Sequence, residues 1–227
     1  MRLITGLALM TMTLGCSATL ADHHGGEAEH AADAAQTVSL FNGEDLTGWI
    51  FDSIDTDDRD QVYTIEDGVL RVSGSPKAVL RTTGYYRDYE FEVQWRWAEK
   101  GGNSGVLIHC STPRELNIWP KSLEVQLASA NAGDFWMIGE RVMVDDFDSR
   151  LRSQRRLPNL TDGSENPLGE WNTMLCRVSG DTVKVFVNGE LVNEGRDLSV
   201  SEGAICLQSE SQPIEFRKVQ IRPLPAE

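Results

Sequence analysis

The residues from Val38 onward form a long succession of short β-type runs separated by turn residues, and this pattern limits the fold more than any other feature. Within the runs, apolar and polar side chains alternate, as they do in strands that bury one face. The expected strands are Val69–Ser73, Tyr89–Ala98, Gly105–Cys110, Ser122–Ala128, Trp171–Ser179, Thr182–Val187, Ala204–Gln208 and Ile214–Arg222. Because these strands follow one another without an amphipathic helix, the sequence predicts an all-β sandwich or jelly roll of antiparallel sheets.

Length and turn chemistry agree with one β-rich domain, which we place at residues 38–225. The 227 residues suit a single large all-β domain. Asn188-Gly189 follows the apolar run of residues 183–187 and predicts a type I′ hairpin turn. The stretch 139–169 has the weakest strand pattern, and an excursion of that length is usually functional or mobile.

The overall charge restricts the classes of partner. Asp and Glu number 35 against 21 Lys and Arg, so the formal net charge is −14, and the basic residues form no run. A surface of this kind repels nucleic-acid phosphates and anionic lipid headgroups. We therefore expect no nucleic-acid partner and no direct binding to a membrane surface, whereas an uncharged sugar is compatible.

The first residues have the layout of an export signal. Arg2 precedes an apolar run from Leu3 to Leu14, which is shorter than the roughly 20 residues of a permanent transmembrane helix. Cleavage after Ala21 would make residues 1–21 a signal peptide, whereas Leu14-Gly15-Cys16 could be a lipobox with a lipid-anchored Cys16. Both alternatives predict an exported bacterial protein, either periplasmic or anchored to the envelope by lipid.

Residues 22–37 are small, acidic and rich in histidine, without an apolar period, and we expect a flexible tether there. Beyond it, the folded region contains Cys110, Cys176 and Cys206. They fit one disulfide with a remaining thiol, or three reduced core residues. The sequence leaves both alternatives open.

Metal-binding patterns are weak. Cysteine and histidine spacings typical of zinc sites are absent, and we expect no required cofactor. One acidic loop could attract Ca²⁺, although a solvated loop is the simpler interpretation. Its carboxylates belong to Asp55, Asp57, Asp58 and Asp60.

The polar faces of several predicted strands favour Glu, Gln and Arg. Phe91, Val93 and Trp95 share one face of their strand, so Gln94 and Arg96 share the other. Planar amide, carboxylate and guanidinium groups can read sugar hydroxyls, and aromatic rings can stack on sugar faces. The sequence thus predicts a polar, sugar-sized groove. Its expected lining comprises Gln94, Arg96, Glu124, Gln126 and Gln208, beside a segment that contains Trp119 and Trp136.

Eight short motifs follow one another along the chain. They are Ser39–Trp49 (SLFNGEDLTGW), Tyr63–Leu70 (YTIEDGVL), Gly102–Val106 (GNSGV), Leu123–Gln126 (LEVQ), Glu170–Asn172 (EWN), Val187–Gly189 (VNG), Gly203–Gln208 (GAICLQ) and Ile214–Val219 (IEFRKV). Together they resemble the 3-keto-disaccharide hydrolase domain family over roughly residues 38–225. The chain departs from the commoner family pattern at Glu210, where that family often has His in Asp-His-Gly, and at Ser129, where it often has Asp.

This resemblance implies a concanavalin A-like jelly roll, export, and hydrolysis of glycosides whose sugar is a ketone at carbon 3. Such a ketone acidifies the proton on carbon 2, so that one base can remove it, expel the group at carbon 1 and let water add afterwards. We expect Glu124 to be that base and His109 to be a candidate general acid. The expected substrate-binding residues are Arg96, Gln94, Gln126, Gln208, Asn103, Trp119, Trp136 and Glu210, with Arg96 as the electrophile.

Three other functional classes are compatible with this fold. A retaining glucanase needs Glu-x-Asp-x-Glu on one strand, and here the strand reads Glu-Val-Gln-Leu-Ala from Glu124 to Ala128. A conventional glucanase is therefore disfavoured. A non-catalytic carbohydrate-binding module and an envelope interaction protein are the remaining alternatives, because a fold does not fix a function.

Overall fold

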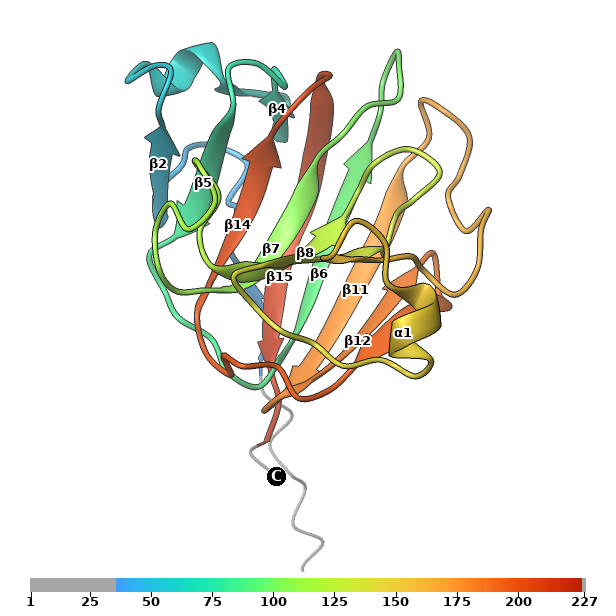
Figure 1. The fold of residues 1–227 in the computed structure, drawn as a ribbon. Helices are drawn as coiled ribbons and strands as arrows, with labels where there is room; N and C mark the ends of the chain where they lie inside the picture. The colour runs from blue at the N-terminus through green and yellow to red at the C-terminus, as the bar shows by residue number, and fades with distance from the viewer. Residues whose placement is uncertain (1–35, 226–227) are drawn as a thin grey trace, which may run out of the picture. The chain divides into compact units, whose positions relative to one another are not determined.

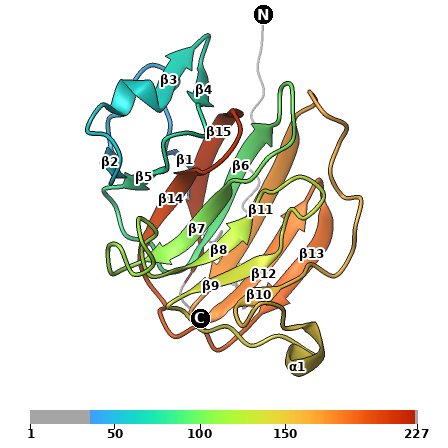
Figure 2. The same cartoon turned by 45° about the horizontal axis from the view of Figure 1, so that its top comes forward.

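The computed structural model describes residues 36–225, whose strands form two antiparallel sheets that lie one behind the other (Figures 1 and 2). Sheet I has the order β13-β12-β11-β6-β15-β4-β3, and β1 also pairs with β15. Its strands are β13 (Glu190–Gly195), β12 (Thr182–Val187), β11 (Asn172–Ser179), β6 (Tyr89–Arg96), β15 (Ile214–Pro223), β4 (Val69–Val72), β3 (Tyr63–Glu66) and β1 (Val38–Ser39).

Sheet II has the order β10-β9-β8-β7-β14-β5-β2. Its strands are β10 (Arg156–Leu157), β9 (Phe135–Ile138), β8 (Ser122–Gln126), β7 (Gly105–Cys110), β14 (Ala204–Ser209), β5 (Ala78–Thr82) and β2 (Trp49–Ser53). Helical structure in the described residues is limited to a single turn at α1 (Phe147–Arg150) and a 3-10 turn, η1 (Arg59–Gln61). The predicted all-β class, a jelly-roll sandwich, is confirmed.

The main core fills the space between the sheets. Phe91, Val93 and Trp95 on β6 are fully buried there, and Leu123 and Val125 on β8 face them from the other sheet. Because side chains alternate along a strand, this packing decides which residues point outward. Gln94 and Arg96 point away from the core on sheet I, and Glu124 and Gln126 point away from it on sheet II.

All eight predicted strands form, with ends no more than two residues from those expected. Asn188 and Gly189 have φ of 50° and 86°, and they join β12 to β13. These positive φ values are those of the predicted type I′ turn. The short strands β1, β2, β3, β5, β9, β10 and β13 were not predicted, because their sequences are too brief or too mixed to show a period.

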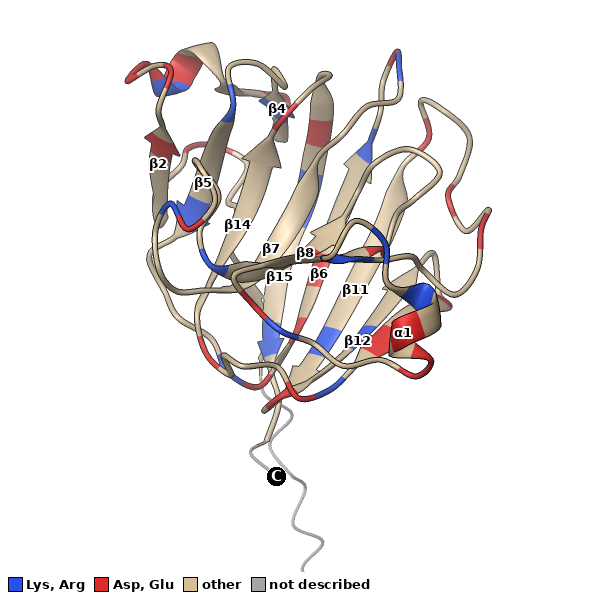
Figure 3. Ribbon diagram, viewed as in Figure 1, with Lys and Arg blue, Asp and Glu red and all other residues tan. Residues whose placement is uncertain are grey.

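The outer face of sheet II is covered, whereas a simple two-layer sandwich would leave it wet. Every residue of β7, β8 and β14 is buried. A second hydrophobic cluster covers this face, in which Ile118 and Trp119 pack with Leu107 and Cys206. The strands β7 and β14 carry no Lys, Arg, Asp or Glu (Figure 3). Polar side chains that do occur on this face are therefore held in an apolar setting.

Several sequence predictions fall outside the described residues: the signal peptide at 1–21, the lipobox Cys16, and the tether at 22–37 except for its last two residues. They stay predictions. Within residues 36–225, no helix combines the length and the apolar character that a membrane crossing requires.

Candidate functional site

A cavity of about 160 Å³ opens on the outer face of sheet II. Glu124 and Gln126 of β8 and Trp136 and Ile138 of β9 line it from the strands. The loops add Asn103, Leu116, Trp119, Arg155 and Glu210. Six of the ten residues that the sequence singled out for the site thus line one cavity. They are Glu124, Gln126, Asn103, Trp119, Trp136 and Glu210.

Strand register explains why the central groups meet. Glu124 pairs with Leu107 on one side and with Trp136 on the other, so the carboxyl and the indole share a face. Gly105 pairs with Gln126 and has no side chain of its own. A Cβ placed on Gly105 would lie 2.8 Å from Oε1 of Glu124 and 2.8 Å from Oε1 of Gln208. The glycine therefore leaves the space in which these two side chains approach each other.

The Glu124 carboxyl is buried, with 6% of the residue exposed, and it forms no ion pair with the described residues. Burial, together with the nearby charge of Glu210, raises its pKa from 4.5 to about 8. The positive charge of the Arg155 guanidinium acts in the opposite direction. Glu124 is consequently protonated for most of the time at pH 7 and can exchange that proton near neutrality.

Unpaired polar atoms gather around this carboxyl. Both amide atoms of Gln208, Oδ1 of Asn103 and Nε1 of Trp136 are buried without a hydrogen-bond partner among residues 36–225. Buried polar atoms normally have partners, and a cluster without them fits a site that a polar ligand completes. The amide of Gln126 is oriented differently, because its Oε1 accepts from the backbone N–H groups of Leu127 and Ala128, both at 2.9 Å.

The guanidinium at the cavity belongs to Arg155, which was not among the predicted site residues. Its Cζ lies 5.6 Å from the ring centroid of Trp136, and its carbonyl accepts a 2.9 Å hydrogen bond from the Met137 N–H. Next to it, Arg156 donates to the buried carboxylate of Asp134 over 2.7 Å and fixes this segment to the sheet. The only sequence signal was general: Arg155 lies in the excursion 139–169, predicted to be functional or mobile.

Arg96 and Gln94 do not reach this cavity, which corrects the prediction that they line it. Both lie on β6 of sheet I and point away from the core, so the whole thickness of the sandwich separates them from Glu124. Arg96 forms an ion pair with Glu215 at 2.5 Å and stacks on Trp171 at 4.6 Å. Gln94 accepts a hydrogen bond from Arg217 at 2.7 Å. Alternation placed both side chains on the outer face of β6, but β6 belongs to sheet I and not to the sheet that carries Glu124.

His109 is likewise absent from the cavity lining, which corrects its placement as a general acid beside Glu124. The residue has φ of 54° at a register irregularity between β7 and β14. Its ring lies 5.9 Å from that of Tyr89, and Nδ1 donates to the Val200 carbonyl over 2.8 Å. Burial lowers the pKa of His109 and keeps the imidazole neutral. These contacts describe a structural residue.

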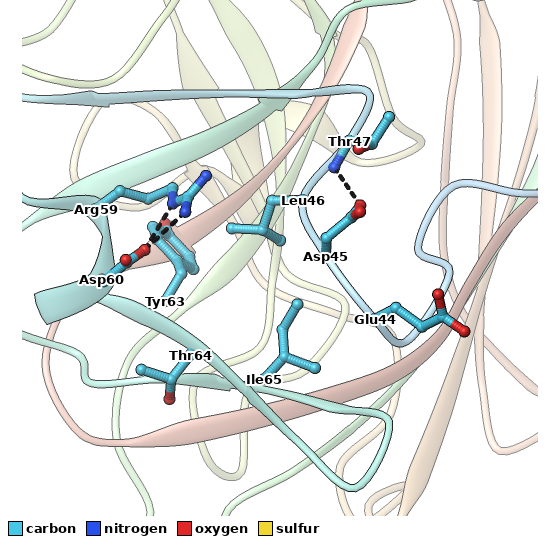
Figure 4. Close-up of a pocket in the computed structure, with 9 residues that line it drawn as sticks. All are labelled: Glu44, Asp45, Leu46, Thr47, Arg59, Asp60, Tyr63, Thr64 and Ile65. Carbon is cyan, nitrogen blue, oxygen red and sulfur yellow. Dashed lines mark hydrogen bonds and ion pairs between the residues drawn. The ribbon is translucent and has the colours of Figure 1, made fainter.

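A larger hollow of about 560 Å³ lies elsewhere, between the segments of residues 44–47 and 59–65 (Figure 4). Two of its carboxylates already have partners: Asp45 accepts from the Thr47 N–H at 2.8 Å, and Asp60 pairs with Arg59 at 2.8 Å. The site is assigned to the smaller cavity, because buried polar atoms of Asn103, Trp136 and Gln208 without partners in the described residues lie at or beside it. In the described part of the chain, no three His, Cys, Asp or Glu side chains converge as metal ligands, and this includes the acidic loop 55–60.

Comparison with known families agrees with the geometry. The 3-keto-alpha-glucoside-1,2-lyase-like domain matches residues 36–222. The chain belongs to this family. The match includes every cavity residue and both sheets, so the resemblance seen in the sequence motifs is confirmed. No curated protein sequence matches the chain.

Solved structures of carbohydrate-active proteins share the fold. A candidate glycosyl hydrolase from Parabacteroides distasonis is 22% identical with a TM-score of 0.61, over 83% of this chain and 94% of that one. The κ-carrageenase of Pseudoalteromonas carrageenovora is 13% identical with a TM-score of 0.55, over 87% and 99%. The carbohydrate-binding module CBM66 of Bacillus subtilis is 11% identical with a TM-score of 0.55, over 78% and 96%. At these identities the likeness establishes the jelly-roll fold.

Proposed function

We propose that this chain cleaves glycosides whose sugar carries a ketone at carbon 3. A base removes the proton on carbon 2, the bond from carbon 1 to the glycosidic oxygen breaks, and water then adds to carbon 1. The observation that carries this proposal is the buried Glu124, which forms no ion pair in the described structure and lies in a family-matched cavity among unpaired polar atoms. An elimination of this kind needs proton transfer and a stabilised enolate.

The cavity residues supply those requirements. Arg155 is positively charged at the cavity and can stabilise the enolate oxygen at carbon 3, the role that the sequence had given to Arg96. Gln208 and Asn103 offer unpaired amide atoms to sugar hydroxyls. Trp119 and Trp136 offer aromatic faces, and the Nε1 of Trp136 is a free donor.

Glu124 is the residue that we expect to donate a proton to the departing glycosidic oxygen. With its pKa raised to about 8, chiefly by burial, the residue is predominantly protonated at pH 7 and is therefore a proton donor, whereas the sequence predicted it to be the base. A protonated Glu124 is suited to neutralise the departing glycosidic oxygen. This assignment requires no metal or organic cofactor.

The experiment compares a 3-keto-disaccharide with its unoxidised parent. The purified protein should release monosaccharide from the keto form alone. Release from both would indicate an ordinary glycosidase, and binding without release would indicate a carbohydrate-binding module. Either result would contradict the proposal.

We also propose export to the periplasm or the envelope, which rests on the signal-like residues 1–21. Expression of the full chain in a Gram-negative bacterium, followed by fractionation, tests this. A Cys16→Ser variant separates the two forms, because only a lipid-anchored protein would lose its membrane association.

A further inference from the structure

Two carboxyl groups open into the cavity, and their surroundings differ. Glu210 follows β14 directly and accepts a 2.7 Å hydrogen bond from Nδ2 of Asn103. Its other oxygen lies 3.3 Å from Nζ of Lys77. The Asn103 amide and the Lys77 ammonium are thus both directed at this carboxylate. Glu124, by contrast, is more deeply buried and forms no ion pair with the described residues.

The segment that carries Glu210 is held in place from both sides. The Ser211 hydroxyl accepts from the Asn103 N–H at 2.6 Å, and the Ser209 hydroxyl donates to the Pro76 carbonyl at 3.0 Å. Lys77 also lies 5.8 Å from the ring centroid of Trp119, another cavity residue. Glu210 is therefore fixed at the rim of the cavity, with its charge compensated by one lysine.

The carboxyl groups of Glu124 and Glu210 have different charged neighbours. The charge of Glu210 disfavours ionisation of Glu124, and it adds to the burial that already keeps Glu124 protonated. Arg155 is the cation that faces Glu124, and Lys77 is the cation that faces Glu210. Pairs of titratable groups whose environments separate their protonation states commonly divide acid and base roles.

We propose that Glu210 is the base that removes the proton on carbon 2, and that Glu124 is the acid that protonates the departing glycosidic oxygen. This inference rests on the proposed function. It gives a chemical role to Glu210, one of the two positions at which the chain departs from the commoner family pattern. Lys77 is a positioning residue, because it orients Glu210; Asn103 orients Glu210 through Nδ2 and keeps Oδ1 for the substrate.

The steps balance. The Glu210 carboxylate takes the proton from carbon 2, and the electron pair of that bond forms an enolate with the carbonyl at carbon 3. The enolate collapses to restore the ketone and forms a double bond between carbons 1 and 2. The bond from carbon 1 to oxygen breaks, and the leaving oxygen receives the proton of Glu124. Ionised Glu124 then takes a proton from water as the water oxygen adds to carbon 1, and Glu210 returns its proton to carbon 2. Both side chains regain their starting states.

The test uses the full chain with a 3-keto-glucoside carrying deuterium at carbon 2. It compares the wild type with Glu210→Gln and Glu124→Gln, and with Glu194→Gln as a matched control. Glu194 is an exposed residue of β13 whose carboxylate pairs with Lys184 at 3.3 Å, away from the cavity. Loss of deuterium to water reports the base, and release of the aglycone reports cleavage.

We expect Glu210→Gln to lose both deuterium exchange and cleavage, by roughly 10²-fold or more. Glu124→Gln should keep the exchange and lose cleavage of an alkyl glycoside. It should regain much of that cleavage with a nitrophenyl leaving group, which needs no protonation. Glu194→Gln should behave as the wild type does, and circular dichroism confirms that each variant is folded.

Exchange that survives in Glu210→Gln and disappears in Glu124→Gln would reverse the two roles and overturn the inference. Wild-type rates in Glu210→Gln would also overturn it. A wild-type protein that cleaves no 3-keto-glycoside would instead refute the proposed function, so the two failures are distinguishable.

Discussion

Trp136 lies directly opposite Glu124 in the ladder between β8 and β9. Because opposed residues in an antiparallel pair share a face, the indole borders the carboxyl that the proposed chemistry uses. The Arg155 guanidinium lies 5.6 Å from the ring centroid of the same indole. A sugar in the cavity would therefore meet an acid, an aromatic face and a cation from three consecutive segments of structure.

Arg155 and Arg96 give opposite predictions for the same substitution. Arg155→Met should lower kcat for a 3-keto-glycoside by roughly 10²-fold, because it removes the charge that stabilises the enolate. Arg96→Met should leave kcat unchanged, since Arg96 pairs with Glu215 on sheet I. Steady-state kinetics on both variants checks this. Equal losses in the two variants would show that the cavity does not contain the electrophile.

Glu124 should make the stability of the fold depend on pH. Its folded pKa of about 8 exceeds the ordinary value of 4.5, so the folded protein holds a proton that the unfolded chain releases between these values. The free energy of unfolding should fall by up to about 5 kcal/mol as the pH rises through this interval, at 1.36 kcal/mol for each pH unit.

Glu124→Gln lacks this titration. Its melting temperature should exceed that of the wild type at pH 8.5, and the difference should shrink as the pH falls towards 4.5. Thermal unfolding at several pH values measures the trend, with Glu194→Gln as the control for a surface carboxylate. A difference that does not change with pH would contradict the raised pKa of Glu124.

A substitution at Gly105 tests whether the space beside Glu124 and Gln208 is required. A methyl group there would lie 2.8 Å from Oε1 of both Glu124 and Gln208, so Gly105→Ala should displace these side chains. We expect a loss of activity greater than tenfold and a stability cost of about 1–3 kcal/mol. Gly189→Ala, whose Cβ meets no atom within 4 Å but whose φ of 86° is strained for alanine, should lose stability without losing activity. Full activity in Gly105→Ala would show that Glu124 and Gln208 need not approach each other.

His109 should contribute to stability and not to turnover. His109→Asn keeps a residue that tolerates φ of 54°, but it removes the ring that packs on Tyr89. We expect a destabilisation of about 1–3 kcal/mol, with kcat within a few-fold of the wild type. Denaturant unfolding and kinetics on the folded variant measure the two effects separately. A large loss of kcat without a loss of stability would return His109 to the mechanism.

The alternation of apolar and polar residues predicted the fold and showed which side chains of each strand point away from the core. Phe91, Val93 and Trp95 identified the buried face of β6, and Leu123 and Val125 did the same for β8. Alternation says which side chains leave the core, but it does not say to which of the two sheets a strand belongs. This is why Arg96 was expected beside Glu124 and lies on the opposite surface.

The loop contributions depended on tertiary contacts that a single sequence does not show. Arg155 reaches the cavity because Arg156 pairs with the buried Asp134, which lies more than 20 residues earlier in the chain. The position of Glu210 depends in the same way on Asn103 and Lys77. His109 was placed by a register irregularity, for which alternation gives no warning.

The rate at which Glu124→Gln releases monosaccharide from a 3-keto-disaccharide, relative to the wild type and Glu194→Gln, tests the central claim most directly. If cleavage takes place in the cavity on the outer face of sheet II and Glu124 protonates the leaving oxygen, the rate of Glu124→Gln should fall by roughly 10²-fold or more at pH 7. Glu194→Gln should keep the wild-type rate. A folded Glu124→Gln protein that releases the sugar at the wild-type rate would contradict the account.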